Sequence, residues 1–122
     1  MDIRPHRKLD VWQKSMQLTK DIYEITTSFP RSEVYGLSSQ MRRAATSIPS
    51  NIAEGAGRRG NKEFLQFIGI AQGSASELDT QLELATMVGY IDKATGENLA
   101  QKLNDLTKML YGLSRALHPE RP

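Results

Sequence analysis

Apolar residues recur every three or four positions along four stretches of the chain, and polar residues fill the positions between them. This spacing matches the turn of an α-helix and predicts helices over residues 9–27, 33–58, 61–88 and 92–116. No stretch alternates apolar and polar residues with the period of two that a half-buried strand requires. Short connections between helices favour antiparallel neighbours. We therefore expect an all-α fold, an antiparallel up-down four-helix bundle.

The first predicted helix is apolar over a wide arc. Its charged residues share one side of the helical wheel, and the other side carries two apolar rows: Leu9, Trp12, Met16 and Tyr23, and then Val11, Leu18, Ile22 and Ile25. A helix that only covers a core needs an apolar stripe a little over about 100° wide. The non-charged face of this helix spans roughly 200°. Its width predicts neighbours on two sides.

The second predicted helix contains a proline within its apolar repeat. Its inward-facing positions are Val34, Leu37, Met41, Ala45, Ile48 and Ile52. Pro49 removes one backbone hydrogen bond, but the apolar phase continues across it from Ile48 to Ile52. We therefore predict that the helix is kinked at Pro49 and not broken. Ser32 is its predicted N-cap, and the glycines that follow Glu54 are its predicted stop.

The third and fourth predicted helices each present a regular apolar seam. The third seam consists of Phe64, Ile68, Ala71, Ala75, Leu78, Leu82, Ala85 and Gly89, and the fourth of Leu99, Leu103, Leu106, Leu110, Leu113 and Leu117. Their alternating spacing of four and three residues is typical of helices that pack side by side, and small residues allow close approach. Asn61 is the predicted N-cap of the third helix. We expect a single domain over residues 1–122, with an ordered core at about residues 9–117.

Composition and charge narrow the possible functions. The chain has 122 residues and no cysteine, which excludes disulfides and thiolate metal sites. No apolar run approaches the roughly 18 residues that a membrane-spanning helix needs, and residues 1–8 do not resemble a signal peptide. We expect a cytoplasmic protein without a membrane partner. The first 62 residues hold 11 Lys and Arg against 6 Asp and Glu, and the rest hold 5 against 8, so the net +2 is unevenly placed.

The residues needed for common enzyme chemistries are missing. The two histidines, His6 and His118, both lie outside the predicted helices, so a nucleophile with a histidine base is not expected. No glutamate has a histidine three residues later, the pattern by which helical bundles hold metal pairs. There is no phosphate-binding Gly-x-x-x-x-Gly-Lys-Ser/Thr string. We therefore predict no enzyme activity, no catalytic residues, no metal site and no cofactor.

Two polar stripes border the apolar faces of the second and third predicted helices. The first contains Arg43, Ser47, Asn51, Glu54 and Arg58, and the second contains Ser74, Glu77 and Gln81. Such stripes can fix the register of a subunit interface, in which Asn51, Glu54, Glu77 and Gln81 would form a polar network. They can equally be ordinary solvated faces. In a third interpretation, Arg42, Arg43, Arg58 and Arg59 contact phosphates of RNA or DNA.

Several strings resemble a known family. They are Leu9-Asp-Val-Trp-Gln13, Phe29-Pro30, Tyr35-Gly-Leu37, Gln40-Met-Arg-Arg-Ala-Ala45, Ser47-Ile-Pro-Ser-Asn-Ile-Ala-Glu-Gly55 and Gln72-Gly-Ser-Ala-Ser-Glu-Leu-Asp-Thr-Gln-Leu82. They resemble the four-helix-bundle family first noted as reading frames in intervening sequences of bacterial 23S ribosomal RNA genes. The resemblance covers residues 9–117 and is most specific around Pro49.

The resemblance implies a four-helix bundle that assembles into a homopentameric ring. It also implies similarity to the accessory protein of diversity-generating retroelements, a basic pentamer that binds nucleic acid and a reverse transcriptase. Our leading hypothesis is a non-enzymatic oligomer that binds nucleic acid weakly and without sequence preference, with Arg58 and Arg59 as the main phosphate contacts. The alternative hypothesis is a protein–protein scaffold with no nucleic-acid role.

Overall fold

The computed structural model describes residues 3–118, and these residues form four long α-helices. They are α1 (Asp10–Thr26), α2 (Leu37–Ala56), α3 (Asn61–Met87) and α4 (Lys93–Leu117). Two short 3-10 helices precede the first two of them, η1 (Pro5–Lys8) and η2 (Arg31–Glu33). Within residues 3–118 there is no strand. The predicted all-α four-helix bundle is confirmed.

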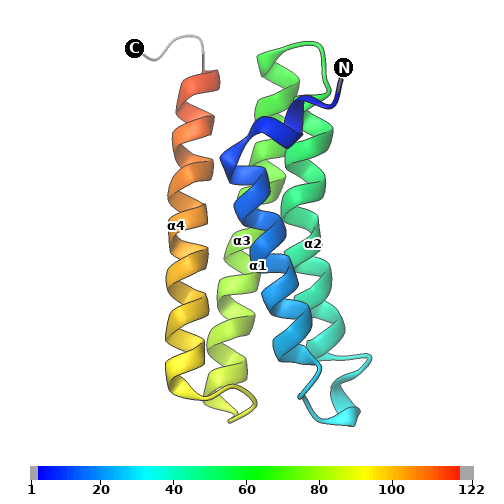
Figure 1. The fold of residues 1–122 in the computed structure, drawn as a ribbon, viewed down its shortest axis with the longest axis vertical. Helices are drawn as coiled ribbons and strands as arrows, with labels where there is room; N and C mark the ends of the chain where they lie inside the picture. Colours follow the sequence, from blue (N-terminus) through cyan, green and yellow to red (C-terminus); the bar gives the residue numbers. More distant parts are fainter. Residues whose placement is uncertain (1–2, 119–122) are drawn as a thin grey trace.

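The four helices pack in a ring around one core. Contacts join α1 to α2, α2 to α3, α3 to α4 and α4 to α1, whereas α1 and α3 lie diagonally and their backbones do not approach each other closely. In Figure 1 the chain runs down α1, up α2, down α3 and up α4. One end of the bundle therefore holds η1, the α2–α3 turn and the end of α4, and the other end holds the α1–α2 and α3–α4 connections.

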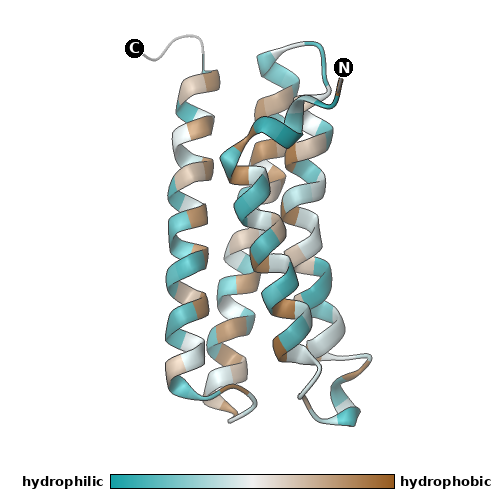
Figure 2. Ribbon diagram, in the orientation of Figure 1, coloured by the Kyte–Doolittle hydropathy of each residue, from teal (hydrophilic) through white to brown (hydrophobic). Residues whose placement is uncertain are grey.

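The core consists of the apolar positions that repeat every three or four residues. Ile22, Met41, Ile52, Ile68, Leu78 and Leu110 are all fully buried. Small side chains at Ala71, Ala75 and Ala85 are buried as well and allow α3 to approach its neighbours closely. Figure 2 shows apolar and polar segments alternating along each helix, which is the pattern expected when one face of a helix is buried. The predicted inward faces of α3 and α4 are confirmed at most positions.

Helix α2 continues through Pro49, which is buried inside it. The predicted continuity of the helix is confirmed, while a kink at this residue stays a prediction. The helix ends at Ala56, and Gly57 is its C-cap.

The predicted start of α2 was wrong. Ser32 is not an N-cap but lies within η2, and α2 begins at Leu37 with Gly36 before it. Val34 is 57% exposed, so it does not belong to the inward face. The physical reason is a contact from Glu33, whose Oε1 accepts a hydrogen bond from the Leu37 amide at 3.1 Å and supplies the cap that the local sequence lacks.

The predicted N-cap of α3 was wrong as well. Gly60 takes that position with extended backbone, and Asn61 is the first helical residue. No side chain caps this end, whereas the start of α4 is capped by Asp92, which accepts from the Thr95 amide at 2.8 Å.

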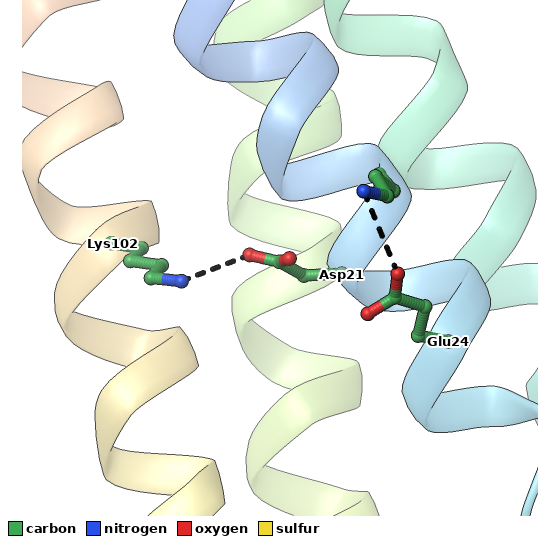
Figure 3. Close-up of polar contacts among 4 residues, drawn as sticks. Asp21, Glu24 and Lys102 are labelled. Carbon is green, nitrogen blue, oxygen red and sulfur yellow. Dashed lines mark hydrogen bonds and ion pairs between the residues drawn. The ribbon is translucent and has the colours of Figure 1, made fainter.

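Two ion pairs lie at the surface of the bundle, one between helices and one within a helix. Lys102 of α4 lies 3.0 Å from Asp21 of α1, and Lys20 lies 3.9 Å from Glu24 within α1 (Figure 3). Pairs in solvent contribute little to stability because water and salt screen them. Burial of the apolar faces is therefore the main source of the bundle's stability.

Candidate nucleic-acid and oligomer surfaces

The four arginines predicted to bind phosphates do not form one cluster. Arg42 and Arg43 lie near the start of α2, and Arg58 and Arg59 lie in the turn after it. With a rise of about 1.5 Å per residue, the two pairs are separated by about 20 Å along the bundle. They are two distinct basic sites.

Arg42 is held against the end of α1. Its Nε donates to the Thr26 hydroxyl at 2.8 Å and its Nη2 donates to the Tyr23 carbonyl at 3.3 Å. Its guanidinium also lies 4.8 Å from the centre of the Tyr23 ring. Arg42 therefore helps to join α1 to α2. Its neighbour Arg43 is exposed, and its guanidinium has no polar partner within residues 3–118.

Of Arg58 and Arg59, too, only the first has partners for its side chain among residues 3–118. Arg58 lies 3.2 Å from Glu54, which is the i,i+4 pair expected from the sequence, and 4.8 Å from the centre of the Phe67 ring. Arg59 is exposed in the turn and has no partner in the described part of the chain. Since Arg58 is half exposed, both side chains remain accessible to a ligand.

The end of the bundle around this turn is strongly basic. Helix η1 contacts α2, which brings the cations before α1 to the same end as the α2–α3 turn (Figure 1). Among residues 3–118, the basic residues at this end are Arg4, Arg7, Lys8, Arg58, Arg59, Lys62 and Arg115, and the acidic residues are Asp10, Glu54 and Glu63. The charge asymmetry between the two halves of the sequence therefore becomes a basic end in the folded bundle, which we call the basic end below.

The predicted polar network is only partly assembled within one chain. Ser74 of α3 donates to the Ser47 hydroxyl at 2.8 Å, and the Asn51 amide donates to the same hydroxyl at 3.0 Å. Asn51 also donates to the Ser47 carbonyl at 2.7 Å. This short chain of hydrogen bonds joins α2 to α3. Glu54 lies outside it, since its carboxylate pairs with Arg58.

Glu77 and Gln81 are not joined to that chain either. Glu77 is exposed and lines a surface hollow of about 400 Å³ together with Gln40, Arg43 and Ser47. Gln81 is only 6% exposed, and its side-chain oxygen has no hydrogen-bond partner among the described residues. A buried acceptor without a donor is costly. Gln81 is therefore the member of the set that gains most from a further polar group.

Two exposed apolar rows remain on diagonally opposite helices. On α1, Met16 is 46% and Tyr23 is 43% exposed, and Trp12 beside them is half-buried. On α3 and at its C-cap, Ile70, Leu84 and Val88 are about half exposed. We call these the α1 row and the α3 row. Exposed apolar side chains that align along a helix are typical of surfaces that bind another protein.

Neither a metal site nor a membrane span is found in the part of the chain that the structure describes. Among residues 3–118, no group of three His, Asp or Glu side chains is placed to hold a metal ion. None of the helices formed by these residues is both long and apolar enough to cross a membrane.

The fold and these surfaces define the class as an all-helical four-helix-bundle protein with a basic end and apolar rows on opposite sides. The chain matches the family model of the 23S rRNA-intervening sequence protein over residues 7–112, and it belongs to that family. The resemblance seen in the sequence is therefore confirmed. No curated protein matches the chain in sequence.

A solved structure is similar over nearly the whole bundle. It is the crystal structure of a protein with unknown function from the S23 ribosomal protein family of Bacteroides thetaiotaomicron VPI-5482. The two share 25% sequence identity, and the match covers 86% of this chain and 98% of the other with a TM-score of 0.78.

Proposed function

We propose that this protein is a non-enzymatic homo-oligomer, a pentameric ring, that binds nucleic acid weakly and without sequence preference. The observation that carries the nucleic-acid part is the basic end, where residues 3–118 place seven cationic and three acidic side chains. Phosphate contacts of Lys and Arg supply affinity without reading base sequence. Repeating the basic end around a ring would add the weak contacts of the subunits through avidity.

The ring is supported by where the two apolar rows lie. Because α1 and α3 lie diagonally across the bundle, the exposed α1 row and α3 row face different sides of it. A contact between two different patches on successive subunits generates a ring when the rotation closes. The number five comes from the family resemblance alone.

Mixing two interface variants tests this arrangement. Met16→Glu/Tyr23→Glu removes the α1 row, and Ile70→Glu/Val88→Glu removes the α3 row. In a ring, each variant alone is monomeric by light scattering, and an equimolar mixture forms a dimer through the one intact interface. The wild type is expected at about five times the chain mass of 13.7 kDa. A wild-type monomer at micromolar concentration would contradict the proposal. Lys108→Glu, on the exposed side of α4, is the control and should not change the mass.

Salt-dependent RNA binding tests the nucleic-acid part. Affinity for a labelled RNA should fall steeply between roughly 50 and 200 mM salt, because bound phosphates release counterions. Arg58→Ala/Arg59→Ala should weaken binding across unrelated sequences and make it less dependent on salt. Lys14→Ala/Lys108→Ala removes the same charge from exposed positions elsewhere and is the matched control.

A protein–protein scaffold is the second candidate function. It is favoured by Met87, which is 77% exposed at the end of α3 next to Leu84 and Val88. If the wild type does not bind RNA at low salt, or binds it regardless of salt and of Arg58→Ala/Arg59→Ala, the scaffold becomes the better explanation.

A further inference from the structure

A hollow at the opposite end of the bundle from the basic end collects arginine side chains. It lies where α1 ends and α2 begins and has a volume of about 470 Å³. Arg31, Arg42 and Arg43 line it, and no Asp or Glu does. Three cations that share a hollow without a counter-charge repel one another, so the arrangement favours an anion between them. We call this hollow the arginine pocket.

A hydroxyl group without a hydrogen-bond partner among the described residues opens onto the same hollow. Ser38 lines the arginine pocket and is only 7% exposed, yet its side chain has no hydrogen-bond partner within residues 3–118. Serine and threonine hydroxyls inside helices often donate to a carbonyl one turn earlier, as the Thr46 hydroxyl does to the Arg42 carbonyl. The hydroxyl oxygen itself is not enclosed by protein atoms and stays open to the hollow. An oxygen atom of a ligand in the pocket can therefore form a hydrogen bond with the Ser38 hydroxyl.

The first turn of α2 adds free amide groups. The Leu37 amide donates to Glu33, and the regular backbone bonds of the helix begin with the Gln40 amide, which donates to Gly36. In the described chain the amides of Ser38 and Ser39 have no acceptor, and both residues line the pocket. Unsatisfied amides at the start of a long helix favour negative charge.

Arg42 is already oriented for this role. Its bonds to Thr26 and Tyr23 use two of the five N–H groups of the guanidinium, and the others stay available. A guanidinium that is fixed before binding loses little freedom when it binds an oxyanion, and its planar donors match two oxygens at once.

Two carboxylates of the elements around the pocket, Glu33 and Glu24, make contacts of their own. Both oxygens of Glu33 accept hydrogen bonds, one from the Leu37 amide and one from the Tyr90 hydroxyl at 2.8 Å. Glu24 pairs with Lys20 (Figure 3). Neither carboxylate lines the arginine pocket, and Glu77 lines a separate hollow that it shares with Arg43. The wall of the pocket therefore contains arginines and no carboxylate among the described residues.

We propose that the arginine pocket binds a terminal phosphate, a phosphate monoester carried by a nucleotide or by the end of an RNA strand. A monoester has about two negative charges at neutral pH and three free oxygens, which suits three arginines, two amides and a hydroxyl. The apolar side chains of Phe29, Pro30 and Val34 form a wall for the organic part of the ligand. This volume is within the range of pockets for small molecules, about 300–1,000 Å³. The site is separate from the basic end, so the two proposals can fail independently.

The first experiment compares AMP with adenosine by calorimetry. AMP is expected to bind at least about tenfold more tightly, because adenosine lacks the charged hydrogen-bond acceptors. Arg31→Gln/Arg43→Gln should abolish this preference. Arg58→Gln/Arg59→Gln, which removes the same charge from the basic end, should leave it unchanged. Ser38→Ala should weaken AMP binding severalfold, and Ser50→Ala, an exposed serine of the same helix, should not. Thermal melting of each variant verifies that the bundle is still folded.

The second experiment distinguishes the two sources of the phosphate. A short RNA with a 5′-phosphate is compared with the same RNA carrying a 5′-hydroxyl. If the phosphorylated RNA binds more tightly and Arg31→Gln/Arg43→Gln removes this preference, the ligand of the pocket is the phosphate at the end of an RNA strand. A preference for AMP over adenosine without any 5′-phosphate effect assigns a free nucleotide.

Other outcomes overturn the proposal. AMP that binds no better than adenosine, together with equal binding of the two RNAs, rules out a terminal-phosphate site. If Arg58→Gln/Arg59→Gln, and not Arg31→Gln/Arg43→Gln, removes the preference for AMP or for the 5′-phosphate, the phosphate binds at the basic end and not in the arginine pocket. If a phosphate preference is found that survives Arg31→Gln/Arg43→Gln, the phosphate binds elsewhere on the protein.

Discussion

The hydroxyl group of Thr19 in α1 lies 3.1 Å from the carbonyl oxygen of Ala45 in α2. In a regular α-helix that carbonyl accepts from the amide four residues later, which here is Pro49. Proline has no amide hydrogen, so Ala45 loses its donor inside a buried part of the helix. Thr19 supplies the missing hydrogen bond from the neighbouring helix. This contact explains how a proline can be buried in α2 without ending it.

A double-mutant cycle tests this contact. Thr19→Val keeps the shape of the side chain and removes the hydroxyl, and it should cost about 1 kcal/mol of unfolding free energy. The Thr19 hydroxyl also lies 2.7 Å from the Ser15 carbonyl, so the single variant does not separate the two acceptors. Pro49→Ala restores the backbone donor to Ala45. In that background Thr19→Val should cost less, by about 0.5 kcal/mol or more.

The control is Thr27→Val, whose hydroxyl donates only within its own helix to Tyr23. It is exposed and should cost less than about 0.5 kcal/mol. If Thr19→Val lowers the free energy of unfolding equally with and without Pro49→Ala, as measured in urea, the Thr19 hydroxyl donates to the Ser15 carbonyl alone.

Two glycines of the bundle are predicted to respond to alanine in opposite ways. A Cβ atom on Gly55 would lie 2.8 Å from Phe64 Cδ1 and 2.8 Å from Phe67 Cβ, because α2 and α3 approach closely there. Gly55→Ala should therefore cost about 1–3 kcal/mol through overpacking. A Cβ on Gly73 would meet nothing within 4 Å, and Gly73→Ala should stabilise the helix by about 0.5–1 kcal/mol. Thermal melting of both variants is the measurement, and equal shifts would show that the α2–α3 contact is looser than described.

The repeat of apolar residues was enough to predict the helices. Each helix buries one face, and the residues of that face lie close together in the sequence. The continuity of α2 was predicted from Ile48 and Ile52 for the same reason. Its first turn was not, since the cap comes from Glu33, which is also held by Tyr90, 57 positions further along the chain. A pattern among neighbouring residues cannot reveal a contact with a distant residue. Ser32 was therefore wrongly assigned as the N-cap.

The candidate sites were less predictable than the fold. Arg42 and Arg58 are both arginines of one helix and its turn, but the first is bound to Tyr23 and Thr26 and the second to Glu54. Only the Arg58–Glu54 pair follows from sequence spacing. The sequence did not indicate that Arg31 and Ser38 belong to one site. Arg31 of η2 and Ser38 of α2 line the same hollow only when α1 and α2 pack together.

The seam of α3 gives a direct test of the core. Leu78 is fully buried and Leu82 is 2% exposed. Replacing either by alanine removes buried methyl groups and leaves a cavity, which should cost about 2–5 kcal/mol. Lys14→Ala on the exposed side of α1 should cost less than about 0.5 kcal/mol. Similar losses of stability for Leu78→Ala and Lys14→Ala in urea unfolding would show that the inward face is wrongly assigned.

Glu33 and Tyr90 should make the stability of the bundle depend on pH at both extremes. The Leu37 amide, and after it the Tyr90 hydroxyl, lower the pKa of Glu33 in the folded protein, and partial burial opposes this. The hydrogen bond to Glu33 raises the pKa of Tyr90, and burial adds to it. A carboxyl whose pKa is lower in the folded state stabilises that state above its ordinary pKa, about 4.3, and loses this effect as the pH falls through the lowered value. A phenol with a raised pKa stabilises the fold below its ordinary pKa, about 10, and loses this effect as the pH rises.

Urea unfolding at a series of pH values, with matched variants, separates the contributions. Glu33→Gln should remove part of the acid-induced loss of stability, and Tyr90→Phe should flatten the profile in alkali. Asp92 is a second source of acid sensitivity, because the amide and then the hydroxyl of Thr95 lower its pKa. Asp92→Asn should therefore remove a further part, and Glu33→Gln/Asp92→Asn should leave the flattest acid profile of the set. Parallel acid profiles for the wild type and Glu33→Gln would mean that the carboxylate is not bound to Leu37 and Tyr90 in solution. The cap at the start of α2, and with it the placement of Ser38 in the arginine pocket, would then need a different explanation.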